Sequence, residues 1–113
     1  MENMLSKEIK IKVEEIVEII KNSSEYKEYL LLEEKMKNHS RIPKLIEEIK
    51  KSQKELVRLQ TEGKNIEEKE KVLSTLEKEL LEIPLYNDFI DAQKKLNEVF
   101  SLIKETMDNI FQL

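Results

Sequence analysis

The side chains that could take part in catalysis or metal binding are few and scattered along this 113-residue chain. His39 is the sole histidine and lies in a polar stretch, so we interpret it as a surface turn residue. Carboxylate pairs such as Glu14 and Glu18 share a helix face, but they lack the nearby histidines that di-iron bundles use. The serines have no evident histidine base, and the lone Gly63 cannot form a phosphate-binding loop. We therefore expect no catalytic residue, no small-molecule substrate, and no bound metal or cofactor.

The remaining chemistry in the sequence is electrostatic. The chain has a net charge of −4, which disfavours general affinity for nucleic acid. Residues 35–58 nevertheless carry 8 bases and 3 acids, a net charge of +5. Four of these bases form a stripe on a helical wheel: Lys44, Lys51, Lys54 and Arg58. Because no aromatic residue interleaves with them to stack on nucleobases, we favour a solvated face or contact with an acidic protein over direct RNA binding.

Five helices are predicted to position these side chains. The chain has one glycine, two prolines and 39% charged residues, a composition typical of an all-α protein with long helices. The expected fold is an elongated bundle of about five helices in a single domain, residues 1–113. It includes an antiparallel helical hairpin and a long C-terminal helix. The predicted helices are Ser6–Lys21, about Glu25–Lys37, one from Ile42 and Pro43 to Gly63, one after Asn65, and one from Pro84 to about Phe111.

Apolar periodicity predicts which side of each helix is buried. In the first helix these residues are Leu5, Ile9, Val13, Ile16 and Ile20. In the third they are Ile42, Leu45, Ile46, Ile49, Gln53, Leu56 and Gln60, with Leu59 at the edge. In the fourth they are Ile66, Lys69, Leu73, Leu76, Leu80 and Ile83, with Lys69 the one misfit. Ser6 is the expected cap of the first helix, and Ser23 or Ser24 that of the second.

The C-terminal helix carries an apolar face that is wider than one neighbouring helix requires. Its seam is Leu85, Phe89, Ala92, Leu96, Val99, Ile103, Met107 and Ile110, and a second row is Tyr86, Ile90, Phe100 and Phe111. A helix of about 27 residues is roughly 40 Å long, whereas a compact domain of this size is about 34 Å across. We therefore expect a homo-oligomer, a dimer or higher. The candidate protein-interaction residues are Leu31, Tyr86, Phe89, Ile90, Leu96, Phe100 and Ile103.

The sequence also indicates in which cellular compartment the protein is expected. No segment approaches the roughly 20 apolar residues that span a bilayer. The N-terminal residues lack a continuous apolar stretch followed by a small-residue cleavage site, so no secretory signal is evident. We expect a cytoplasmic protein without membrane contact.

Three stretches form a pattern that covers nearly the whole chain: SSEYKEYLLLEEKM at 23–36, IPKLIEEIKKSQKELVRLQ at 42–60, and LEKELLEIPLYNDFIDAQKKLNEVFSLIKETMDNI at 76–110. The last is the most specific, particularly Glu82-Ile83-Pro84 followed by Phe89, Asp91, Gln93 and Asn97. On this pattern the chain resembles the YlbF/YmcA family of small helical proteins. It is most similar to the YmcA branch, with the YheA-type branch as the alternative.

The resemblance implies a non-enzymatic regulatory subunit. Such proteins associate with YlbF-like and YaaT-like proteins, and the complex acts with the endoribonuclease RNase Y in mRNA processing. Its loss affects competence, sporulation and biofilm formation. Several relatives carry cysteines associated with iron–sulfur binding, but this chain has none, so either partners supply the ligands or this member works without a cluster. The alternatives to such an adaptor are a direct RNA-binding module and a structural or chaperone-like helical oligomer.

Overall fold

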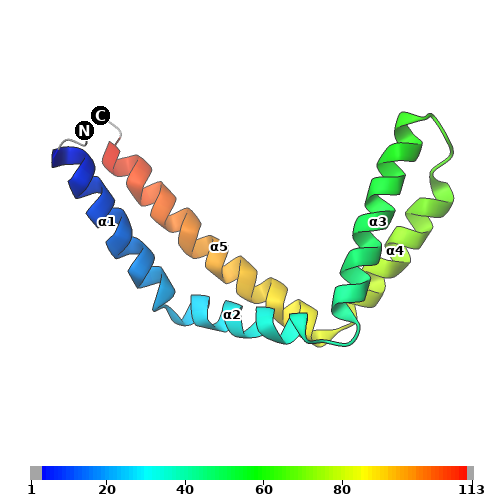
Figure 1. Ribbon diagram of the computed structural model, residues 1–113, viewed down its shortest axis with the longest axis horizontal. Coiled ribbons are helices and arrows are strands. Elements are labelled where there is room, and N and C mark those ends of the chain that lie inside the picture. Colours follow the sequence, from blue (N-terminus) through cyan, green and yellow to red (C-terminus); the bar gives the residue numbers. More distant parts are fainter. Residues whose placement is uncertain (1–3, 112–113) are drawn as a thin grey trace. The chain divides into compact units, whose positions relative to one another are not determined.

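The computed structural model describes residues 4–111, and the side chains of residues 4–109. Over these residues the chain forms five α-helices and no strand (Figure 1). The helices are α1 (Met4–Lys21), α2 (Ser24–Lys37), α3 (Ile42–Thr61), α4 (Glu67–Leu81) and α5 (Pro84–Phe111). The predicted all-α fold, with its hairpin and long C-terminal helix, is confirmed. Within the described residues, no helix has the length and apolar character needed to cross a membrane.

The helices are divided between two compact units. The first unit contains the residues up to Leu31 and those from Ala92 onward, which are α1, the start of α2 and most of α5. The second unit, Leu32–Asp91, contains the end of α2, the whole of α3 and α4, and the start of α5. Each unit buries its own set of side chains.

The second unit is built on an antiparallel hairpin of α3 and α4. Gly63 ends the first arm with a φ of +68°, a left-handed conformation that glycine adopts without steric penalty. The Lys64 amide donates to the Leu59 carbonyl at 2.9 Å, and the Gly63 amide donates to the Gln60 carbonyl at 3.1 Å. This pair of bonds is the Schellman arrangement, which satisfies the last carbonyls of a helix. The predicted stop at the chain's one glycine is confirmed.

The buried seam of α3 differs from the prediction at Ser52, Gln53, Leu59 and Gln60. Ile42, Leu45, Ile49 and Ser52 are buried, Ile46, Leu56 and Leu59 are half-buried, and Gln53 and Gln60 are exposed. The prediction of Gln53 and Gln60 as inward-facing residues was therefore wrong. The 3–4 spacing runs from Ile49 through Ser52 to Leu56, and it places Leu59 on the seam and not at its edge. In the stripe predicted for α4, Leu80 and Ile83 are buried, and the remaining members are half-buried: Ile66, Lys69, Leu73 and Leu76.

Side chains at the helix starts satisfy backbone amides that have no partner inside the helix. Ser23 accepts a hydrogen bond from the Tyr26 amide at 3.2 Å, so it is the serine that caps α2. Asn65 accepts one from the Glu67 amide at 2.9 Å. Pro84 is the first residue of α5, as predicted. Ser6 lies inside α1, which begins two residues earlier at Met4, so the predicted cap there was wrong.

The first unit contains few buried side chains. Figure 1 shows α1 and the later part of α5 running antiparallel, and Met107 of α5 lines the same hollow as Leu5, Ile9 and Val13 of α1. None of the residues described in α1 is buried. The side of α1 that was expected to be covered is therefore only partly covered within the chain. The physical reason is that α1 has too few neighbouring helices in its own unit to enclose it.

Candidate protein-interaction surfaces

Among the residues that the structure describes, no group of three or more His, Asp or Glu side chains could hold a metal ion. The chain contains no cysteine, so it has no thiolate to offer an iron–sulfur cluster. His39 has a structural role: its Nδ1 accepts hydrogen bonds from the amides of Arg41 at 3.0 Å and Ile42 at 3.2 Å, at the start of α3.

Exposed apolar side chains are concentrated in the first unit. Among the described residues, fourteen large apolar side chains are exposed, and eleven of these belong to this unit. We call these eleven the open apolar surface: Met4, Leu5, Ile9, Ile11, Val13, Val17 and Ile19 of α1, Leu30 and Leu31 of α2, and Phe100 and Leu102 of α5.

Part of the open apolar surface is concave. A hollow of about 710 Å³ lies along α1, and Leu5, Ile9, Val13 and Ile16 line it together with Met107 of α5. Lys12 and Glu8 line its polar margin. A concave apolar patch with a polar rim is typical of a site that receives side chains from another protein. The apolar side chains of the first unit are therefore only partly enclosed by their own unit.

The predicted interaction residues are divided between the two units. In the first unit Leu31 and Phe100 are exposed, Ile103 is half-buried, and Leu96 is buried at 5% exposure. In the second unit Tyr86 and Ile90 are half-buried and Phe89 is buried. Within a single chain, therefore, Leu96 and Phe89 contribute to the interior, whereas Leu31 and Phe100 remain available to a partner.

The predicted interaction residues included none of α1, whose apolar side chains are largely exposed. Ile11, Ile19 and Leu102 were not among the candidate residues, although Ile19 is 70% and Leu102 is 64% exposed. The signal was present in the pattern: Ile19 widens the stripe that contains Leu5, Ile9 and Val13, and Ile11 falls outside it. Apolar residues on a second side of a helix indicate a second neighbour.

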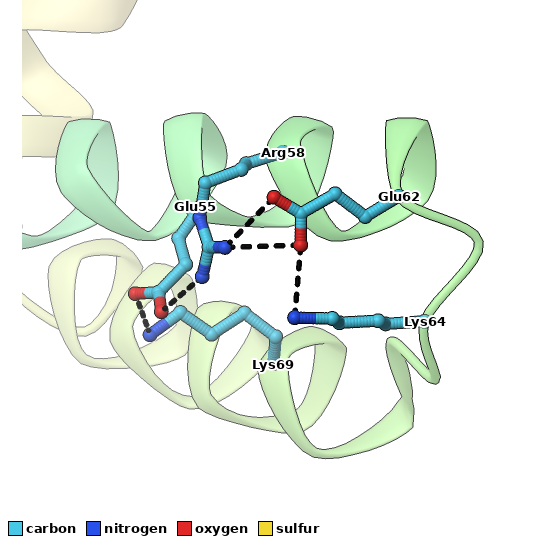
Figure 2. Close-up of polar contacts among 5 residues, drawn as sticks. All are labelled: Glu55, Arg58, Glu62, Lys64 and Lys69. Atoms are coloured by element: carbon cyan, nitrogen blue, oxygen red, sulfur yellow. Dashed lines mark hydrogen bonds and ion pairs between the residues drawn. The ribbon is translucent and has the colours of Figure 1, made fainter.

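The basic stripe of α3 is partly neutralised by its own chain (Figure 2). Arg58 Nη1 donates to both carboxylate oxygens of Glu62 at 3.2 Å, and Nη2 donates to Glu55 at 3.4 Å. Lys69 of α4 lies 2.9 Å from Glu55 and joins the two arms of the hairpin. This ion pair explains why a lysine occupies the inner stripe of α4. The hydrogen bond and charge of Lys69 lower the pKa of Glu55, with Arg58 contributing less.

The other members of the stripe differ in their pairing. Lys51 Nζ lies 3.5 Å from Glu47, one turn away on the same helix. Lys44 and Lys54 are exposed and form no ion pair within residues 4–109. The pKa of Glu62 is lowered mainly by its hydrogen bond with Lys64, which lies 3.0 Å away across the hairpin turn. The Arg58 end of the stripe is thus an internal network, and the free cations lie elsewhere on α3.

A comparison with known protein families shows which family the chain belongs to. A family model described as control of competence regulator ComK, YlbF/YmcA, matches residues 9–110 and so includes part of every helix. The chain belongs to the YlbF/YmcA family. The resemblance seen in the sequence is confirmed at the level of the family, and the family's description gives it a regulatory role in competence. No curated protein matched the chain.

Proposed function

We propose that this YlbF/YmcA protein is a regulatory adaptor that catalyses no reaction and acts by assembling with other proteins. Its partners are copies of itself, homologous YlbF-like proteins and YaaT-like proteins. The assembly modulates RNase Y-dependent mRNA processing in the cytoplasm, with effects on competence, sporulation and biofilm formation. The observation that carries this proposal is the open apolar surface, in a chain whose family has a regulatory description.

The driving force for assembly is burial of the open apolar surface. Covering apolar area contributes about 25 cal/mol per Å² removed from water. Ile11, Ile19 and Leu102 would become core residues of the assembly, since they face no part of their own chain that covers them. Any iron–sulfur cluster in the complex would take its thiolates from partner proteins, because this chain contains no cysteine.

Affinity purification of a tagged chain from the cells that express it tests the proposal. YlbF-like and YaaT-like proteins should co-elute at fixed stoichiometry, and Leu102→Asp should reduce their yield while Leu81→Asp does not. Leu81 is a matched control because it is an exposed leucine on α4 in the second unit. A protein that elutes without these partners, or with an unselective set of proteins, would contradict the adaptor proposal.

Direct RNA binding is the alternative that the same preparation tests. It predicts that the purified chain binds RNA with an affinity that falls steeply with salt and with charge reversal at Lys51 and Arg58. The ion pairs of Lys51 with Glu47 and of Arg58 with Glu55 and Glu62 weaken this alternative, because phosphates would have to displace them. RNA binding that is absent or insensitive to salt would exclude it.

A further inference from the structure

A second periodic stripe runs along α3, on a different side from its buried seam. Pro43, Ile46, Lys50, Gln53 and Val57 follow one another at spacings of 3, 4, 3 and 4 residues. This is the a/d spacing with which one helix receives another. Ile46 is half-buried and Val57 is 60% exposed, so the stripe has no complete cover in its own chain. An exposed valine near the C-terminal end of a charged helix is the feature that needs explaining.

Two adjoining hollows lie over this stripe, both within the second unit. One, of about 460 Å³, is lined by apolar Met36, Ile42, Pro43 and Ile46, and its polar lining includes Lys50. The other, of about 380 Å³, is a shallow and open depression between side chains of α3 alone: Lys50, Gln53, Lys54 and Val57. Because both include Lys50, they follow one another along α3. We call the two hollows together the α3 groove.

The α3 groove has an excess of positive charge once its internal ion pairs are taken into account. Its acidic lining residues already have cationic neighbours: Glu33 lies 3.3 Å from Lys37, and Glu47 lies 3.5 Å from Lys51. Lys50 and Lys54 form no ion pair among residues 4–109. The groove therefore offers two unpaired ammonium groups beside an apolar floor.

We propose that the α3 groove binds an acidic amphipathic helix of a partner protein. Its apolar side chains, spaced at i, i+3 or i+4 and i+7, would cover Ile46 and Val57. Its Asp or Glu side chains would pair with Lys50 and Lys54. Helix-in-groove recognition of this kind needs an apolar floor for affinity and flanking charges for register and specificity.

A second copy of the chain fits the α3 groove less well. In an antiparallel pairing of two α3 helices, Ile46 would meet Val57 of the second copy, but the two Lys50 side chains would lie within about one helical turn of each other. Like charges at that spacing are unfavourable. The charge of the groove therefore selects an acidic partner over self-association. This inference shares one premise with the proposed adaptor function: the chain binds a partner protein.

The test uses two labelled synthetic peptides of about 20 residues, long enough to form a helix. Both carry leucine at the a and d positions, and their flanking positions carry Glu in one peptide and Lys in the other. Fluorescence anisotropy with the full chain should show binding of the Glu peptide that weakens with added salt. Val57→Glu and Lys50→Glu should each weaken it tenfold or more. Val72→Glu and Lys71→Glu, the same changes at exposed positions of α4, should leave it unchanged.

Four results would overturn the inference: no binding of the Glu peptide, equal binding of the Lys peptide, equal losses in the α4 controls, or unchanged binding in the groove variants. All substituted positions are exposed, so each variant should keep the wild-type helical circular dichroism, which is measured first as the check on folding. Sedimentation of the Val57→Glu variant separates the two proposals. Self-association like that of the wild type, together with lost peptide binding, supports a distinct groove. A wild-type protein that self-associates but ignores the Glu peptide overturns the groove alone and leaves the adaptor function standing.

Discussion

Ile19→Asp should dissociate the assembly without unfolding the chain. Ile19 is 70% exposed, so a partner that covers it removes most of its side chain from water. Full burial of an isoleucine side chain contributes about 1.5–3 kcal/mol, and the uncovered part of Ile19 therefore about 1–2 kcal/mol. An aspartate loses that contribution and adds a desolvation penalty of at least about 1–3 kcal/mol for an unpaired polar group. The combined loss is roughly 2–5 kcal/mol, which raises the dissociation constant of the assembly by about 30-fold or more.

The same substitution should leave the isolated chain nearly as stable as the wild type. Substitutions at exposed positions usually change the free energy of unfolding by about 0.5 kcal/mol or less. Light scattering across a concentration series measures assembly, and urea unfolding at the lowest concentration measures the chain alone. Leu81→Asp, at an exposed position of α4, is the control and should retain assembly. Unchanged assembly in Ile19→Asp, or equal loss in Leu81→Asp, would refute the reasoning.

Three further predictions concern the hairpin and its start. Gly63→Ala should destabilise the chain by about 1–2 kcal/mol in urea unfolding, because the φ of +68° at this position is left-handed. An added Cβ would meet no atom of the described chain within 4 Å, so the whole loss is backbone strain. His39→Ala should lower stability by about 1 kcal/mol through the loss of its two amide partners, whereas His39→Asn, which can accept the same bonds, should stay close to the wild type. Glu55→Gln tests the ion pair between Glu55 and Lys69. The pKa of Glu55 is lowered in the folded state from its ordinary 4.5. The ion pair therefore contributes its full stability above pH 4.5, and this stability is lost as the pH falls through the pKa that Glu55 has in the folded state. The difference in urea midpoint between wild type and Glu55→Gln should therefore vanish in acid, and a difference that persists there would contradict the assignment.

The helices could be predicted from the sequence because their boundaries are set by local chemistry. Gly63, Pro84 and Asn65 each mark an end or a start by backbone conformation or by capping, and all three do so in the structure. The choice between Ser52 and Gln53 on the inner face of α3 was harder. These neighbours differ by 100° on the helix, and the structure buries the smaller one. Apolar character alone could not decide between two polar residues.

The surface of the first unit was the part that sequence could not predict. Periodicity identifies which residues of α1 share a face, but it does not say whether that face is covered by the same chain or by another. Leu5, Ile9 and Val13 form a regular stripe and yet remain exposed. The hydrogen bonds that His39 accepts from the amides of Arg41 and Ile42 were also hidden, because histidine is not among the residues that usually cap a helix start. The ion pair of Lys69 could be found only once α3 and α4 were side by side.

Hydrogen exchange of α1 is the measurement that tests the central claim most directly. None of the described residues of this helix is buried in the single chain, so its amides should exchange rapidly in a dilute sample of the protein alone. Raising the concentration, or adding a YlbF-like partner, should slow exchange in residues 4–21 while that of the α3–α4 hairpin stays nearly constant. Exchange in α1 that is independent of both concentration and partner would contradict the account.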